Sequence, residues 1–236
     1  MKTNRHFLLA VIFGFALAFT FSCSGGGSSG GDPNGGGGSN KCADIANCKK
    51  KQIGSQVWLA ENLNIDVSGS KCYEGKSANC DKYGRLYDWS TAMALDASCN
   101  SNSCASQIST PHRGICPSGW HIPSDDDWNV LMKFVNPSCS DTNYCEGAGT
   151  KLKAKSEWAG NGNGGTDDLG FSALPGGGSH SVGSFSDVGY SGWWWSASED
   201  VDSNGAYSRI MSFNGESSIY YSIGKSGLFS VRCVQD

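Results

Sequence analysis

The cysteines are the feature that most restricts how this chain can fold. The 236-residue sequence contains 11 of them, and eight lie in close pairs. In an exported protein, close pairs predict local disulfides. The residues between them are mostly small and polar, so we expect disulfides, and not buried apolar side chains, to hold these loops in place. The expected pairs are Cys42 with Cys48, Cys72 with Cys80, Cys99 with Cys104, and Cys139 with Cys145.

Cys116 and Cys233 are the two cysteines left in the body of the chain. We expect them to form a fifth disulfide that ties the end of the chain to its middle. In the chain-entropy description, closing a loop of more than ~100 residues stabilises a fold by about 4–5 kcal/mol. Zinc is the competing use of cysteine, but the sequence has no Cys-x-x-Cys pair and no histidines at ligand spacing. We therefore predict no metal site and no cofactor.

The amino terminus has the pattern of an export signal. Basic residues precede an apolar run at residues 7–21. That run is short for a permanent span, because a hydrocarbon core of about 30 Å needs roughly 20 apolar residues. Ser22 and Cys23 then resemble a bacterial lipobox, although the usual Leu is missing. We predict a signal peptide at residues 1–22 and lipid attachment at Cys23. The alternative is ordinary cleavage near Ser22 that leaves Cys23 unmodified.

The next segment, residues 23–41, predicts a tether between a membrane and a domain. It is rich in Gly and Ser and offers no apolar side chain to a core, which is typical of flexible chain. About 195 residues follow, enough for one domain at residues 42–236. We expect this domain at the cell envelope, on the outer membrane or the cell surface. The formal charge is −4, and the only basic cluster is residues 49–51, so no nucleic-acid partner is expected.

The apolar pattern predicts an α+β domain with two helices and a small antiparallel sheet. A first strand is expected at residues 52–58, and a short helix begins at Asp88. Ser124, with an acidic residue three positions later, predicts the start of a second helix with a regular apolar stripe. Gly-rich sequence at residues 161–178 predicts turns. The C-terminal part reads as hairpins. Its strand-like runs are residues 193–198, 206–213, 218–223 and 228–234.

Six blocks of sequence are recognisable, in this order: residues 56–63 (QVWLAENL), 83–87 (YGRLY), 116–123 (CPSGWHIP), 170–177 (GFSALPGG), 194–198 (WWSAS) and 230–234 (SVRCV). Together they resemble the Fibrobacter succinogenes major paralogous domain family, over roughly residues 53–236. We refer to them as the signature blocks. An ordered match of this kind is far more specific than any one block.

The resemblance implies a fold related to C-type lectin-like and formylglycine-generating-enzyme-like domains. Such a domain has two helices, a small twisted antiparallel sheet and long loops, which are disulfide-stapled in this chain. The resemblance implies no activity. Formylglycine-type enzymes depend on reactive cysteines, and the even pairing leaves none here. We therefore predict that the protein is not an enzyme and has no catalytic residue.

Two groups of polar residues are candidates for catalysis or for metal binding. His121 could act as a general base if a carboxylate or nucleophile lay near it, but the sequence shows no such partner. The simpler interpretation is a histidine bonded to backbone where the second helix begins. Asp167 and Asp168 offer oxygen ligands of the kind that calcium uses. The spacing of known calcium loops is absent, so we expect a solvated turn there.

Aromatic residues on the C-terminal strands are the predicted ligand-binding residues. In a strand, Trp194 points away from its two neighbours in the Trp triplet. We expect Trp194 and Trp195 to pack in the core and Trp193 to lie at a solvent-exposed edge. With Tyr207, Tyr220 and Tyr221, Trp193 could stack on sugar rings.

Two classes of function remain after this reading of the sequence. The preferred one is a lectin-like recognition domain that binds an extracellular glycan or polysaccharide in adhesion. The alternative is a structural or protein-interaction component of the cell envelope. An enzyme of formylglycine-generating-like fold is the third and least favoured.

Overall fold

The computed structural model describes residues 42–139, 143–160, 164–181, 183–200, 202 and 204–236. The predicted signal peptide, Cys23 and the predicted tether lie outside these residues. Within them, no helix combines the length and the apolar character that a membrane crossing needs.

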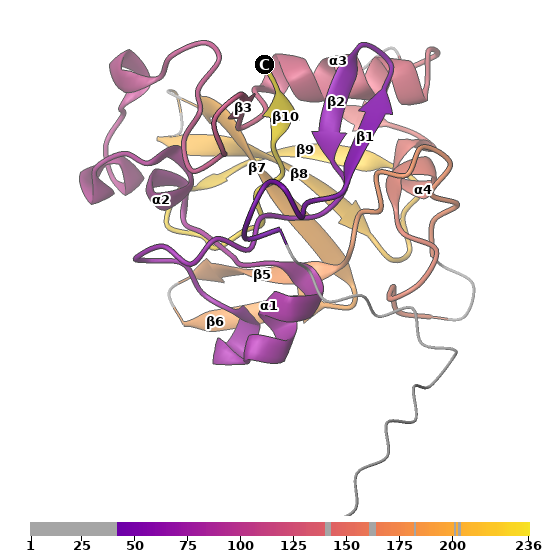
Figure 1. Ribbon diagram of the computed structural model, residues 1–236, viewed down its shortest axis with the longest axis horizontal. Coiled ribbons are helices and arrows are strands. Elements are labelled where there is room, and N and C mark those ends of the chain that lie inside the picture. Colours follow the sequence, from indigo (N-terminus) through magenta and orange to yellow (C-terminus); the bar gives the residue numbers. More distant parts are fainter. Residues whose placement is uncertain (1–41, 140–142, 161–163, 182, 201, 203) are drawn as a thin grey trace, which may run out of the picture. The chain divides into compact units, whose positions relative to one another are not determined.

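A four-stranded antiparallel sheet joins the two ends of the domain. The hairpin of β1 (Lys50–Ile53) and β2 (Gln56–Leu59) divides the single strand predicted at residues 52–58. It turns at Gly54, whose φ of +59° lies in the left-handed region that glycine adopts readily. β10 (Val234–Gln235) pairs with β2 and with β3 (Trp120–His121), which completes the order β1-β2-β10-β3. Figure 1 shows the C-terminal end beside α3 (Asp125–Val135).

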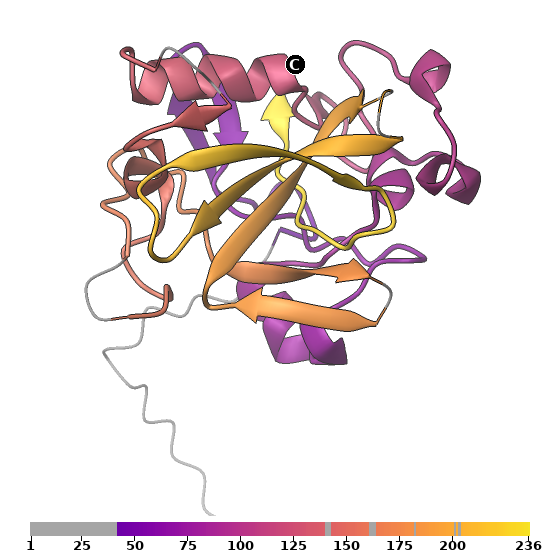
Figure 2. The same ribbon diagram turned by 180° about the vertical axis from the view of Figure 1, so that it is seen from behind.

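A six-stranded sheet forms the other large element, in the order β4-β9-β8-β7-β5-β6. Three of the predicted C-terminal runs, residues 193–198, 206–213 and 218–223, form its centre, and Figure 2 shows them crossing the domain. The fourth run, residues 228–234, is not a strand of this sheet: it makes isolated bridges, and Val234 begins β10. Neighbouring strands are antiparallel, except that β5 and β7 pair in parallel. The strands are β4 (Tyr144–Cys145), β5 (Gly176–Ser181), β6 (Ser184–Val188), β7 (Ser191–Asp200), β8 (Gly205–Ser212) and β9 (Ser218–Gly224).

The hairpin of β5 and β6 lies partly in the Gly-rich region that predicted turns. Its glycines allow close packing that a larger residue would prevent. A Cβ on Gly177 would meet the carbonyl oxygen of Ser186 at 2.5 Å, and one on Gly178 would meet the ring of Phe229 at 2.7 Å. The glycines therefore serve strand packing here, which their density alone does not reveal.

The strongest helix prediction is confirmed in detail. α3 begins after Ser124, whose hydroxyl accepts the backbone N–H of Asp127, and the Asp127 carboxylate accepts the N–H of Ser124 in return. Its apolar stripe is buried. The helix expected from Asp88 forms as α2 (Trp89–Met93), which is only five residues long. The sequence pattern did not predict α1 (Ser77–Tyr83) and α4 (Ala148–Leu152), nor the 3-10 turns at Tyr73–Gly75, Ala97–Asn100 and Ala105–Gln107.

The α+β class is therefore confirmed, but the expected small sheet is wrong. Most of the regular structure is strand, in sheets of four and six strands.

The five expected disulfides are all formed. Four of them close short loops, with sequence separations of five to eight residues. The fifth spans a sequence separation of 117 and joins the segment before β3 to the residue that immediately precedes β10. The structure therefore confirms the pairing of Cys42 with Cys48, Cys72 with Cys80, Cys99 with Cys104, Cys139 with Cys145, and Cys116 with Cys233.

The six-stranded sheet has a hydrophobic core on each face. Trp193 and Trp195 pack against Phe229 on one face, with ring centroids 5.2 and 4.7 Å from it. Trp194 points to the other face and joins the cluster of Trp58 and its neighbours. The alternation predicted for the Trp triplet is correct. Because both faces are covered, all three rings are buried.

A buried polar cluster, which we call the arginine centre, consists of Asn62, Phe171, Trp194 and Arg232. The Asn62 side-chain oxygen accepts N–H bonds from Arg232 Nε at 3.2 Å and from Trp194 Nε1 at 2.8 Å. Another guanidinium N–H of Arg232 donates to the carbonyl oxygen of Phe171, and the guanidinium lies 4.2 Å from the Phe171 ring centroid. The four residues come from four different signature blocks. Those blocks therefore meet in the interior.

Arg232 keeps its charge in the core without a carboxylate in contact. Among the described residues, none forms an ion pair with it, and its exposed fraction is 1%. Burial lowers the pKa of Arg232 to about 9, and the charges of Asp167 and Glu61 offset only part of this effect. The guanidinium is stabilised instead by neutral oxygens and by aromatic faces.

Candidate functional site

Trp193 is not the exposed aromatic residue that the sequence predicts. Its exposed fraction is 8%, and its ring is stacked on Phe229 and lies edge-on to His180 at 4.7 Å. The prediction placed Trp193 at the edge of the sheet. β7 instead lies between β8 and β5, because Gly192 pairs with Met211 on one side and with Gly177 on the other. Trp193 is thus a core residue.

The three tyrosines do not form one surface. Tyr220 and Tyr221 are consecutive in β9 and so point to opposite faces of the sheet. Tyr207 and Tyr220 share a face and are half-buried, with ring centroids 4.5 Å apart. Tyr221 is 54% exposed and lies on the same face as Trp193. The predicted patch of four aromatics is therefore wrong.

Asp167 occupies a turn, as the simpler interpretation of that loop expected. Its carboxylate accepts the backbone N–H and the hydroxyl of Ser172, each at 2.7 Å. Asp168 is exposed. In the described part of the chain, no three His, Cys, Asp or Glu side chains gather as a metal site would require.

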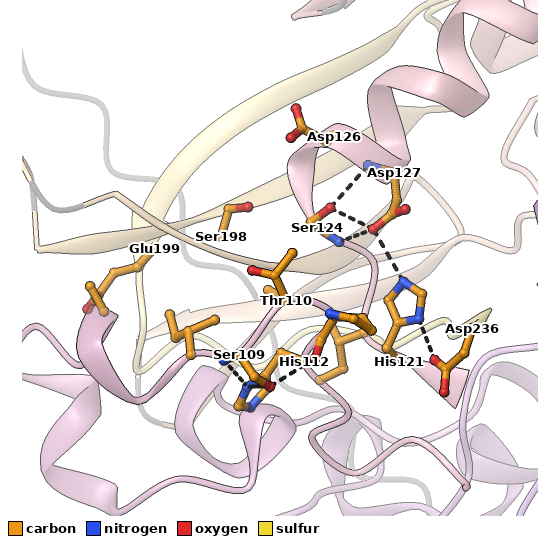
Figure 3. Close-up of a pocket in the computed structure, with 15 residues that line it drawn as sticks. Ser109, Thr110, His112, His121, Ser124, Asp126, Asp127, Ser198, Glu199 and Asp236 are labelled. Atoms are coloured by element: carbon orange, nitrogen blue, oxygen red, sulfur yellow. Dashed lines mark hydrogen bonds and ion pairs between the residues drawn. The ribbon is translucent and has the colours of Figure 1, made fainter. Parts of the chain in front are cut away.

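The structure brings other polar residues together around a cavity of about 770 Å³, which we call cavity A. Its walls come from residues 105–112, from β3 with the start of α3, from the end of β7 and from Asp236. Ile108, Ile122 and Ala197 supply apolar surface. Hydrogen-bonding side chains supply the rest (Figure 3). They are Ser109, Thr110, His112, His121, Ser124, Asp126, Asp127, Ser198, Glu199 and Asp236.

His121 bridges two carboxylates in the wall of cavity A (Figure 3). Its Nδ1 lies 2.8 Å from Asp236 Oδ1, and its Nε2 lies 3.4 Å from Asp127 Oδ2. The backbone partner expected for His121 is therefore wrong. β10 pairs with β3 and brings residue 236 beside residue 121, a proximity that sequence spacing cannot show.

The two carboxylates control the charge of the imidazole. Burial of the ring opposes the charged form, but the hydrogen bonds and charges of Asp127 and Asp236 outweigh it and raise the pKa of His121 above its ordinary 6.5. Burial also works against the charged form of Asp127. Bonds from His121 and Ser124 nevertheless hold the pKa of Asp127 below its ordinary value. The ion pair and the α3 cap therefore share one carboxylate.

Segment 105–112 forms the opposite wall, and the ring of His112 fixes it in place. The Nδ1 of His112 accepts the backbone N–H of Ser109 at 3.2 Å, so its Nε2 is the donor to the carbonyl oxygen of Met93, 2.8 Å away. The Cys99–Cys104 disulfide immediately precedes this segment. Local crosslinks and local hydrogen bonds therefore shape this side of the cavity.

Glu199 lines the far end of cavity A as half of a buried ion pair. Its Oε1 lies 2.5 Å from Lys225 Nζ, and the two side chains are 2% and 0% exposed. The carboxylate also accepts the backbone N–H of Cys104 and the hydroxyl of Ser103. Lys225 thus neutralises Glu199. Asp126, Asp127 and Asp236 are the remaining carboxylates of the lining, which includes no Lys or Arg.

This arrangement suits binding better than covalent chemistry. A general base needs a free nitrogen, and both ring nitrogens of His121 face carboxylates. The Ser124 hydroxyl donates to Asp127 at 2.6 Å instead of to a histidine, so these residues form no nucleophile–base pair. None of the predicted ligand-binding aromatics lines cavity A. The one sequence feature that could have pointed to this site is the capping box, in which Asp127 follows Ser124 by three residues.

Comparisons with known proteins identify the family of this chain and do not assign a role to cavity A. Searches of curated proteins and of solved structures each return no match. The family model described as the Fibrobacter succinogenes major domain matches residues 52–235. This range includes the arginine centre and all of cavity A except Asp236, and it covers well over half of the sequence. The chain therefore belongs to the Fibrobacter succinogenes major domain family.

Proposed function

We propose that the protein is a lipid-anchored recognition module of the cell envelope and that it binds an extracellular glycan in cavity A. The supporting observation is the cavity itself. Its volume of about 770 Å³ falls in the range of known ligand sites, roughly 300–1,000 Å³. Apolar side chains suit the C–H face of a sugar ring. Carboxylates, hydroxyls and imidazoles suit its hydroxyl groups.

A glycan array and a blocking variant test this binding. The mature protein should bind selected oligosaccharides, and Thr110→Trp should abolish the binding because a large side chain at this exposed position fills the cavity. Tyr221→Ala, on the face of the six-stranded sheet, is the control and should bind like the wild type. Absence of binding across the array, or loss of binding in Tyr221→Ala alone, would contradict the proposal.

The location at the envelope rests on the amino-terminal sequence. Cys23 follows the apolar run and precedes the Gly/Ser tether, the order expected of a lipid-anchored domain. Labelled palmitate should enter the wild type and not Cys23→Ser. Equal incorporation into both proteins would contradict lipid attachment at Cys23.

A second candidate function is contact with another protein of the envelope. Its support is the exposure of apolar and aromatic side chains outside cavity A, since large exposed apolar groups often mark contact surfaces. Tyr144 and Tyr221 are 56% and 54% exposed, and Val130 and Phe134 on α3 are 45% and 50% exposed. Crosslinking that depends on these residues, together with no array binding, would favour this candidate over the first.

The relation to C-type lectin-like folds is part of the same proposal. Its support is the family resemblance together with the disulfide-stapled loops and a chain end that returns to the first hairpin. An enzyme remains the least favoured function, because both ring nitrogens of His121 already face carboxylates and the Ser124 hydroxyl donates to Asp127.

A further inference from the structure

The environment of His121 indicates a regulatory role for cavity A. The side chain is 10% exposed, and its ring carries two nitrogens that both face carboxylates. A charged imidazole has two N–H donors and satisfies both carboxylates. A neutral imidazole has one donor, so one carboxylate then faces a lone pair. The protonation state of His121 thus decides how many of its two neighbours it can hold.

The two carboxylates differ in how easily they can leave. Asp127 is held by the backbone N–H of Ser124 at 2.9 Å and by its hydroxyl at 2.6 Å, and losing these bonds would uncap α3. The Asp236 side chain is 49% exposed, so water can replace the histidine as its partner. The contact with Asp236 is the shorter one, 2.8 Å against 3.4 Å for Asp127, but Asp236 is the carboxylate that can turn away from the ring to water without disturbing the helix cap.

The remaining charged and titratable groups near His121 either have partners of their own or are exposed to solvent. Among the residues that line cavity A, Glu199 is paired with Lys225, and the ring of His112 bonds to Ser109 and Met93. Asp126 is exposed on the first turn of α3. On the side of the β1–β2 hairpin, Lys50 lies over the neighbouring ring of Trp120 at 5.9 Å. Asp127 and Asp236 are therefore the groups that respond to the proton.

We propose that His121 is a proton-operated latch on cavity A. With its proton, the imidazole holds Asp236 against the wall of the cavity and occupies both carboxylates. When the proton leaves to solvent, Asp236 is released, and its carboxylate becomes free to accept hydrogen bonds. Ligand hydroxyl groups and the protonated imidazole compete for the same acceptors, so a ligand binds more tightly when the latch is open. This last consequence rests on the proposed function, whereas the latch itself does not.

The latch is tested first without a ligand, by NMR on the isotope-labelled mature protein between pH 5.5 and 8.5. The midpoint of the His121 ring titration should fall by about 1 pH unit in Asp236→Asn. The matched control is Asp126→Asn, which removes a nearby charge without a bond to His121 and should shift the midpoint far less. The {1H}-15N NOE of residues 235–236 should decrease with rising pH in the wild type and stay low throughout in Asp236→Asn. Equal midpoint shifts in the two variants, or pH-independent NOE values in the wild type, would overturn the latch.

The consequence for binding is tested with an oligosaccharide selected on the array. Its affinity should be several-fold higher at pH 8.5 than at pH 5.5 for the wild type and nearly independent of pH for His121→Gln. Equal pH dependence in both proteins would overturn the coupling. If the wild type binds no oligosaccharide at either pH, the proposed function fails, and the NMR experiment still decides whether the latch exists.

Discussion

The arginine centre and cavity A stabilise a buried positive charge with different partners. At the arginine centre, a single guanidinium is surrounded by neutral oxygens and aromatic rings, and no carboxylate of the described residues forms an ion pair with it. In cavity A, an imidazole is held between two carboxylates, one of which is half exposed to solvent. The first environment keeps one charge state across the physiological range. The second can change its charge near neutral pH.

The two regions also differ in which parts of the sequence build them. Signature blocks supply all four residues of the arginine centre. In cavity A, these blocks supply only His121, Ile122, Ala197 and Ser198, while residues 105–112, Ser124, Asp126, Asp127, Glu199 and Asp236 lie outside them. The signature therefore describes a core that holds the fold together. A surface that selects a ligand needs residues that can vary without disturbing that core.

The Cys116–Cys233 bridge gives the largest expected effect, because it connects the two regions. Cys233 follows Arg232, and Cys116 precedes β3 with His121. Changing both cysteines to Ser should lower the free energy of unfolding by about 4 kcal/mol. Chemical denaturation of the mature protein under oxidising conditions measures this loss. The control is Cys99→Ser with Cys104→Ser, whose short loop should cost less. A smaller loss for the long bridge than for the short one would contradict the account.

Arg232→Ala should have the next largest effect, a loss of about 3 kcal/mol. It leaves a cavity and removes the N–H donors to Asn62 and Phe171. Arg232→Met fills more of the space and should cost less, which separates packing from hydrogen bonding. The exposed Arg113→Ala is the control and should leave the denaturation midpoint unchanged. Equal midpoints for Arg232→Ala and Arg113→Ala would show that the arginine centre does not stabilise the fold.

The pH dependence of stability should show a smaller effect of His121. Because the pKa of folded His121 is raised above 6.5, its stabilising contribution is full below about pH 6.5 and is lost as the pH rises through the folded pKa. We expect a contribution of about 1 kcal/mol, since the partner Asp236 is partly solvated. Denaturation at pH 5.5 and 8.5 should reveal it as a difference between wild type and His121→Gln. A difference that grows at pH 8.5 instead would have the wrong sign for this account.

Tyr221→Ala should have the smallest effect on stability, less than about 0.5 kcal/mol, because the side chain is mostly exposed. Trp193→Ala is the matched contrast on the same face and should cost about 3 kcal/mol or more. Thermal unfolding of both variants measures the difference. Similar losses for the two would mean that Trp193 is less buried than the structure indicates.

The comparison of these two regions also shows how far sequence reasoning reaches. The Ser124 cap, the Trp alternation and the four short disulfides follow from local spacing, and all were predicted correctly. The long Cys116–Cys233 disulfide was also predicted correctly, because these two cysteines were left after the close pairs were assigned. The arginine centre and the His121 bridge join residues more than 100 positions apart. Only the strand order brings them together. The prediction that Trp193 is exposed was wrong for the same reason. Its burial depends on the pairing of β5 beside β7, which places His180 against the Trp193 ring.

Mapping the bound ligand on the protein surface tests the central claim most directly. An array-selected oligosaccharide is titrated into the labelled mature protein, and amide chemical shifts are followed by NMR. The account predicts changes at residues 105–112, 121–127, 197–199 and 236, with little change around Tyr144 and Tyr221 or at the arginine centre. Changes confined to the strands that carry Tyr144 and Tyr221 would contradict the assignment of cavity A as the ligand site.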